Sequence, residues 1–194
     1  MHININLNEY MTNVDGLRNL VRYQSAPRVS SETVAEHSYY VAAYVLKLHN
    51  YYEFDLKKAL TMAILHDYAE SFISDVPHPI KKQFPLIEQE LNNAEHNIIS
   101  EHISNEFADW IDEFNNTKTP EGCIVAFADI LSVISYAKYE IGLGNSNYMK
   151  EVLNRAKDRL YKMIELCNEF LYENIKSDEV YKQIEEFTNL QINN

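Results

Sequence analysis

The sequence contains few of the residues that interrupt helices. Only 4 of its 194 residues are glycine and 5 are proline. Long segments between them repeat apolar residues at helical spacing, and stretches that alternate apolar and polar residues are scarce. We therefore predict an all-α fold. The length suits one domain over residues 1–194, with a motif-bearing core at about 8–142 and covering helices at about 147–190.

Positive charge is also scarce. The chain has 17 Lys and Arg against 29 Asp and Glu, which gives a formal net charge of −12. A surface that binds a nucleic-acid polymer needs clustered cations to replace counterions, so this composition argues against such a partner. A small basic pocket for a single phosphate group stays compatible with it.

The chain lacks a cysteine motif. Its two cysteines, Cys123 and Cys167, stand in apolar helical surroundings without a CxxC partner, which predicts buried free thiols in a reducing compartment. No run of 18 apolar residues occurs, and no basic region followed by an apolar run stands at the N-terminus. We therefore expect a cytoplasmic protein with no membrane span and no signal peptide.

The most informative stretch holds the adjacent pair His66 and Asp67. They lie near the end of a helix expected from Leu56 to about Phe72, which Asp55 caps. On such a helix Glu70 follows Asp67 by three residues, so all three polar side chains can face one space. Imidazole and carboxylate together suit a divalent first-row metal. The alternative for the pair alone is an ion pair at a helix end.

Two further residues are candidates for the same site. Thr33 and Glu36 form a capping box, which fixes His37 in the first turn of the helix that follows. Asp129 stands among apolar residues of another helix, and a buried carboxylate without a partner costs several kcal/mol. It therefore needs a metal or a donor. Pairing with a core tyrosine or with Lys138 is the alternative.

The remaining segments complete the predicted bundle. Thr119 and Pro120 begin the central apolar helix, and a glycine pair after it ends the helix. Residues 109–118 read as a polar loop. Other helices are expected at 8–23, 85–107, 147–172 and 178–190, and the last two show no chemistry of their own.

Taken together, these motifs resemble the HD-domain phosphohydrolases, and most of all the bacterial 5′-deoxynucleotidases of that superfamily. The matching segments are Leu20–Tyr23, Glu32–Ser38, Leu65–Glu70, Asp75–Lys81 and Phe127–Leu131. The resemblance implies an HD-domain helical bundle that hydrolyses deoxynucleoside 5′-monophosphates to deoxynucleoside and phosphate. It also implies a homodimer.

The resemblance further implies roles for individual residues. One divalent metal ion (Co, Mn, Zn, Fe or Ni) would be held by four ligands, His37, His66, Asp67 and Asp129. Glu70 would position or activate the attacking water, and Arg22 would bind the phosphate. The deoxynucleotide would also contact Tyr23, Asp75, Val76, Pro77 and His78.

Two departures from the family pattern concern the substrate rather than the metal. Tyr23 replaces a tryptophan thought to exclude the ribose 2′-hydroxyl, and His78 replaces a threonine. The reaction class is therefore predicted more firmly than the substrate. One alternative is a dNTP phosphohydrolase that uses further cations such as Arg28, Lys81 and Lys82. Others are a nucleotide-binding module without catalysis and a helical interaction protein.

Overall fold

The computed structural model describes residues 7–24, 26–76 and 78–177, together with Lys182, Glu186 and Asn189. Its described residues form helices and two isolated bridges, so the prediction of an all-α fold is confirmed. The expected helix at 178–190 lies largely outside these ranges. The described helices are α1 (Leu7–Asn19), α2 (Val34–Leu48), α3 (Leu56–Leu65), α4 (Glu70–Ile73), α5 (His78–Gln83), α6 (Pro85–His102), α7 (Asn105–Asn115), α8 (Pro120–Gly142) and α9 (Ser146–Glu173).

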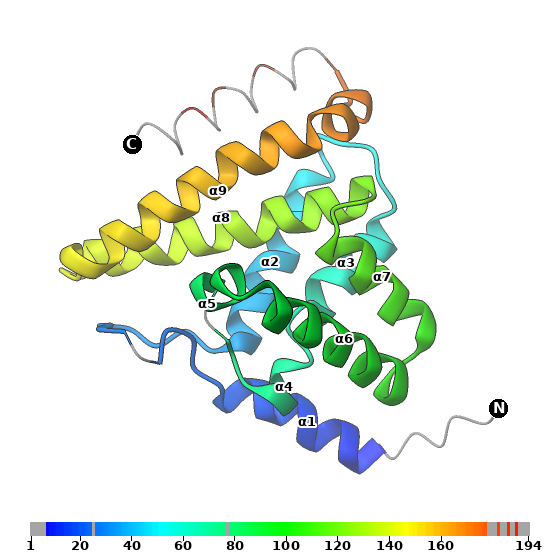
Figure 1. Ribbon diagram of the computed structural model, residues 1–194. Coiled ribbons are helices and arrows are strands. Elements are labelled where there is room, and N and C mark those ends of the chain that lie inside the picture. Colours follow the sequence, from blue (N-terminus) through cyan, green and yellow to red (C-terminus); the bar gives the residue numbers. More distant parts are fainter. Residues whose placement is uncertain are drawn as a thin grey trace.

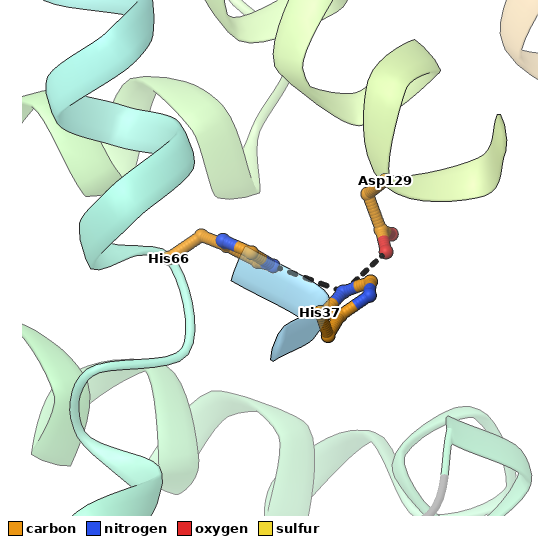
Figure 2. Close-up of side chains that lie close together, drawn as sticks. All are labelled: His37, His66 and Asp129. Atoms are coloured by element: carbon orange, nitrogen blue, oxygen red, sulfur yellow. Dashed lines mark hydrogen bonds and ion pairs between the residues drawn. The ribbon is translucent and has the colours of Figure 1, made fainter. Parts of the chain in front are cut away.

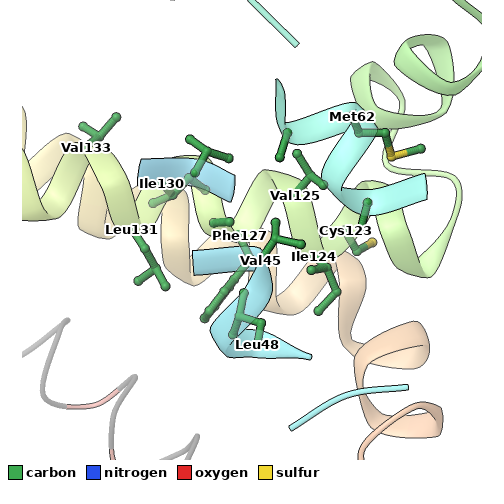
Figure 3. Packing of buried hydrophobic residues seen from close by; sticks show 14 of the residues in the cluster. Val45, Leu48, Met62, Cys123, Ile124, Val125, Phe127, Ile130, Leu131 and Val133 are labelled. Carbon is green, nitrogen blue, oxygen red and sulfur yellow. The ribbon is translucent and has the colours of Figure 1, made fainter. Parts of the chain in front are cut away.

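Helix α8 is the centre of the bundle. It packs against α2, α3, α7 and α9, and α8 and α9 lie side by side along the molecule (Figure 1). Residues of α8 are apolar around most of its circumference, and nearly all of them are buried. Figure 3 shows side chains of α2 and α3, among them Val45 and Met62, packed against this helix. Burial of this apolar surface is the main force that holds the bundle together.

By length and composition alone α8 could also cross a membrane. Within the described residues it is the one helix of this kind, and 78% of its apolar window is buried against the rest of the chain. That burial is the behaviour of a core helix.

Local chemistry sets where the helices begin. Thr33 accepts a hydrogen bond from the Glu36 amide at 3.2 Å, and the Glu36 carboxylate accepts one from the Thr33 amide at 2.7 Å. Asp55 caps α3, and Thr119 caps α8 with Pro120 at its first position. Each of these starts was predicted from the sequence. Side chains and backbone groups three residues apart decide them, so no tertiary contact is needed.

The region between α6 and α8 differs from the prediction. One helix over 85–107 and a loop over 109–118 were expected, but α6 ends earlier and α7 replaces the loop. Ser104 caps α7 by accepting a hydrogen bond from the Phe107 amide at 3.1 Å. The polar residues of this segment form the outer face of an amphipathic helix whose inner face buries Ala108 and Ile111.

The prediction for the two cysteines also needs correction. Cys123 of α8 and Cys167 of α9 are joined in a disulfide, so the prediction of two free thiols is wrong. The two residues are 44 positions apart, and only the side-by-side packing of α8 and α9 brings their Cα atoms to 5.9 Å. The argument from free thiols to a reducing compartment therefore falls away.

A glycine lets α7 and α8 approach closely. A Cβ atom at Gly122 would lie 2.9 Å from the carbonyl oxygen of Glu113, a backbone atom that cannot rotate away. We expect Gly122→Ala to lower the free energy of unfolding by about 1–3 kcal/mol, because the two helices must separate. Gly142→Ala is the matched control, since a Cβ there meets nothing within 4 Å. Urea unfolding followed by circular dichroism measures both, and equal stability of the two variants would contradict this packing.

Candidate metal centre

The His66–Asp67 pair lies where a helix breaks. Helix α3 ends at Leu65, and the C-cap residue His66 donates its amide to the Met62 carbonyl at 2.8 Å before a tight turn leads to α4. The predicted continuous helix over 56–72 is therefore wrong, and Glu70 starts a new helix instead. The break turns the Asp67 carboxylate toward the neighbouring ring, with Oδ2 at 3.2 Å from His66 Nε2.

Three of the four predicted ligands meet in the core. His37 of α2, His66 at the end of α3 and Asp129 of α8 place their ligand atoms within 4.8 Å of one another (Figure 2). His37 Nε2 lies 3.1 Å from Asp129 Oδ1 and 3.3 Å from His66 Nε2. Asp67 borders this group, with Oδ2 at 3.7 Å from His37 Nε2. Helices distant in sequence thus bring all four predicted residues to one place.

The Nδ1 atom of each imidazole makes a hydrogen bond to another group of the protein. His66 Nδ1 lies 2.9 Å from the Ala63 carbonyl, which can only accept, so this nitrogen carries a hydrogen. His37 Nδ1 shares a hydrogen bond of 3.0 Å with Ser132 Oγ. Both Nε2 atoms are thereby directed at the common space, as in protein metal sites. Two such nitrogens with two carboxylates fit a divalent first-row metal.

The charges of the cluster are strongly coupled. Burial, followed by the charge of Arg22, lowers the pKa of His37 to about 4. Burial also opposes charge on His66, but the carboxylates of Asp67 and Asp129 raise its pKa to about 9. Both carboxyl groups are partly buried, yet their histidine neighbours hold their pKa values well below the usual range. A dication bound here would displace the His66 proton.

Arg22 is largely buried, and the charges of Asp67 and Asp129 act on it. Val21 pairs with Thr33 in an antiparallel bridge, and the Arg22 amide donates to the Glu32 carbonyl at 2.9 Å. The Arg22 guanidinium then reaches the Glu32 carboxylate at 3.0 Å, and its side chain is 15% exposed. Burial disfavours its charge, but Tyr23 and Glu32 raise the pKa of Arg22, so the cation is retained. We did not predict from the sequence that Glu32 pairs with Arg22. An acidic residue close in sequence to a candidate anion-binding arginine is a signal that could have indicated it.

Tyr23 follows in a conformation that tyrosine rarely adopts. Its φ angle of 56° lies in the left-handed region, which costs on the order of 1 kcal/mol for a residue with a Cβ. The Tyr23 ring stacks on Tyr136 with centroids 5.4 Å apart, and Arg28 donates to its carbonyl at 2.9 Å. These contacts hold the Tyr23 ring in one position beside Arg22.

Glu70 and Asp75 lie close to the same charges. Glu70 is buried in the first turn of α4, and Asp75 is half-buried in the segment after it. Burial, followed by the charges of Asp67 and Asp75, raises the pKa of Glu70 to about 9. Burial also raises the pKa of Asp75, against the charge of Arg22. A carboxyl group of this kind can exchange a proton near neutral pH once a cation binds beside it.

Some of the residues predicted to contact the deoxynucleotide lie outside the residues that the structure describes. Val76 is half-buried after Asp75. Pro77 and the side chain of His78 lie outside the described residues, and only the backbone of His78 is placed, at the start of α5.

The partner of Asp129 was missed by the sequence analysis. Besides its contact with His37, Asp129 contacts Arg159 of α9, whose Nη2 lies 3.2 Å from Asp129 Oδ2. The sequence had assigned no chemistry to this helix. A usable signal is that Arg159 borders the apolar stripe of α9, between the buried residues Ala156 and Leu160.

Removal of one predicted ligand tests the metal centre. A bound ion stabilises the folded chain by mass action, by about 2.7 kcal/mol at 100 times its Kd. We expect Mn²⁺ to raise the Tm of the EDTA-treated protein, and Asp129→Asn to abolish this shift and the retention of metal. Asp15→Asn is the control, because Asp15 is 59% exposed on α1 and pairs with Arg18 at 3.5 Å. Thermal scans and elemental analysis measure both effects, and the same metal content in both variants would count against the site.

The raised pKa of Glu70 predicts a pH-dependent cost of folding. Its carboxyl ionises near the ordinary pKa of 4.5 in the unfolded chain but keeps its proton to about pH 9 when folded. Its contribution to stability is therefore full below about pH 4.5 and falls as the pH rises toward 9. In EDTA, Glu70→Gln should gain stability over the parent chain, on the order of 1–3 kcal/mol at about pH 8 and less at about pH 5. Urea titrations at both pH values decide this, and a constant difference would refute it.

Comparisons with known proteins show the family to which the chain belongs. Residues 9–177 match the family described as 5′-deoxynucleotidase YfbR-like. The 5′-deoxynucleotidase PM0747 of Pasteurella multocida (strain Pm70) is 28% identical over 155 residues, which cover 73% of this chain and 79% of that protein. The PH0347 protein from Pyrococcus horikoshii OT3 has a similar structure, with 26% identity and a TM-score of 0.67 over 86% of this chain and 96% of that one.

A fourth comparison concerns the fold alone. The cyanophage S-2L HD phosphohydrolase DatZ, solved with dA and one catalytic Zn²⁺ ion, has a TM-score of 0.60 at 20% identity and covers 92% of this chain and 95% of its own. The architecture found here is therefore that of the HD phosphohydrolases. With the family match over most of its length, the chain belongs to the YfbR-like 5′-deoxynucleotidase family and is a hydrolase of phosphoric monoesters with an HD-domain fold.

Proposed function

We propose that this protein removes the 5′-phosphate from deoxynucleoside monophosphates with the help of one divalent metal ion. The observation that carries the proposal is the convergence of two imidazole nitrogens and two carboxylates on one space, beside the buried guanidinium of Arg22. In the reaction the water oxygen bonds to phosphorus and the bond from phosphorus to the sugar 5′-oxygen breaks. One water proton ends on that 5′-oxygen, and the products are a deoxynucleoside and phosphate.

The metal would be held by His37, His66, Asp67 and Asp129. A divalent ion in this position supplies Lewis acidity toward a phosphoryl oxygen and lowers the pKa of a water molecule. Mixed nitrogen and oxygen ligands accommodate Mn, Co, Fe, Ni or Zn. The raised pKa of His66 supports such an ion, because the protonated ring places a positive charge where the dication would bind.

The chain itself would bind the phosphate and manage the water protons. Arg22 donates planar, charged hydrogen bonds to phosphoryl oxygens, a geometry that suits a dianion. Glu70 orients the water and takes one of its protons, which then passes to the departing 5′-oxygen. Its buried position close to Asp67 supports this role, since the group lies at the edge of the metal space and is sensitive to charge there.

The sugar would lie between Tyr23 and Asp75, with the segment Val76–His78 completing the wall. Tyr23 cannot swing aside, because Tyr136 stacks on it and Arg28 holds its backbone. A rigid ring there would leave room for a 2′-hydrogen and crowd a 2′-hydroxyl, and so the proposal includes a preference for deoxyribose.

Two of the three cations that a triphosphate could use already contact other groups. Lys81 pairs with Glu95 at 3.7 Å, and Arg28 donates to the backbone carbonyls of Tyr23 and Gln24. The side chain of Lys82 lies outside the described residues. The homodimer stays a prediction from the family resemblance, and the cytoplasmic location stays a prediction from the sequence.

A panel of nucleotides tests the proposed reaction. With Mn²⁺ or Co²⁺ present, we expect release of phosphate and nucleoside from deoxynucleoside 5′-monophosphates, much slower release from ribonucleoside monophosphates, and none from deoxynucleoside triphosphates. Asp67→Ala is the control and should lower kcat by at least about 100-fold, because it removes a ligand from the metal. Turnover of triphosphates alone would replace the proposed function with the alternative, and inertness toward every nucleotide would remove it.

A further inference from the structure

Three cations act on the carboxylates of the site, and each already has an acidic partner among the described residues. These pairs are Arg22 with Glu32 at 3.0 Å, Lys81 with Glu95 at 3.7 Å, and Arg159 with Asp129 at 3.2 Å. Glu32 and Glu95 are not candidate metal ligands, so we expect the first two pairs to persist when a metal ion binds. Asp129 is a candidate ligand, and so the pair with Arg159 is the one that a bound ion alters.

We propose that Arg159 is a further substrate-binding residue, which donates to a phosphoryl oxygen of the nucleotide once Asp129 is engaged by the metal. The proposal rests on the function proposed above. Asp67 and Asp129 together carry two negative charges, and a divalent ion balances both. The attraction that holds Arg159 to Asp129 is then largely cancelled, and its guanidinium is left without a counter-charge. An incoming phosphate dianion supplies one.

The position of Arg159 is suited to this exchange. Its side chain is 34% exposed while that of Asp129 is 16% exposed, so the guanidinium approaches the buried centre from its solvent side. Its charge also acts on the phenol of Tyr23, as does that of Arg22. The two guanidinium groups therefore border the same space from different elements, the segment before α2 and helix α9. A nucleotide that contacts both the metal and Tyr23 would therefore lie near both guanidinium groups.

The charge balance supports the same conclusion. Arg22 is neutralised by Glu32, and so it offers hydrogen bonds to the phosphate but little net positive charge. With the ion and its two carboxylates neutral as a set, a phosphate dianion would enter a site without a compensating cation. Burial of an uncompensated charge is costly, so a second guanidinium is needed. Arg159 is the described cation whose counter-charge the ion takes away.

A structural role is the competing explanation. Arg159 could simply hold the outer oxygen of Asp129 and so orient a metal ligand, as surrounding residues do in many metal sites. That role would show in the retention of metal and would leave phosphate affinity unchanged at saturating metal. The proposed role shows the reverse, and so the two are separable by measuring both quantities.

The experiment compares Arg159→Leu and Arg159→Lys with the parent chain. Arg155→Leu is the matched control, since Arg155 lies one turn away on α9, is 48% exposed and pairs with Glu151. For each Mn²⁺-loaded protein we would measure metal content by elemental analysis, the Kd of inorganic phosphate by calorimetry, and KM and kcat for dAMP. Circular dichroism checks the fold.

We expect Arg159→Leu to weaken phosphate binding by roughly 10-fold or more and to raise KM for dAMP similarly, with metal content unchanged. Arg159→Lys should recover part of the affinity, because the charge returns without the planar fork. Arg155→Leu should match the parent chain.

Several results would overturn the inference. They are unchanged phosphate affinity in Arg159→Leu, loss of metal with normal phosphate affinity at saturating Mn²⁺, or no phosphate binding by the parent chain. Failure of the proposed function looks different. A protein that hydrolyses no nucleotide, yet binds phosphate in an Arg159-dependent way, would refute deoxynucleotidase activity and leave the role of Arg159 standing.

Discussion

A carboxylate in the middle of the core helix constrains much of this structure. Asp129 stands on α8 between turns that are buried on almost every side, where an isolated negative charge would cost several kcal/mol. The protein compensates it from two directions, with an imidazole of α2 on one oxygen and a guanidinium of α9 on the other. The packing of α2 and α9 on α8 is therefore coupled to the chemistry of the site. Hydrophobic burial brings the helices together, and the carboxylate determines which polar groups must meet there.

The same helix also fixes the segment that carries Arg22. At its C-terminal end Glu140 is fully buried and accepts hydrogen bonds from the amides of Val29 and Ser30, while Tyr136 donates to the Ser30 carbonyl at 2.7 Å. A segment without regular structure is thereby fastened at several backbone groups. This fastening explains how Tyr23 can be held in the left-handed region, since a strained residue persists only where its surroundings over-determine it. One helix thus positions both a candidate metal ligand and the candidate phosphate-binding arginine.

Electrostatic balance connects the two halves of the site. Near the site, Arg22, Lys81 and Arg159 each pair with an acid. The pKa of the Glu70 carboxyl group is raised to about 9. Such a balanced set responds strongly to a dication, because the ion neutralises two carboxylates and frees the groups that had served them. Under the proposal, metal binding separates Arg159 from Asp129. This would give α9, a helix without a recognisable motif, a role in the site.

The sequence by itself determined the helical class, the helix starts at Thr33, Asp55 and Thr119, and the set of candidate ligands. Helix caps depend on side chains and amides three residues apart, and the ligand motifs stand in short segments, so both can be read locally. Other features were decided only by tertiary structure. These are the break of α3 at His66, the identity of α7 as a helix, the disulfide, and the contact of Arg159 with Asp129. The break and α7 depend on which face of a segment meets the core. The disulfide and the Arg159 contact join residues 30 or more positions apart, and only the packing of α9 along α8 brings them together.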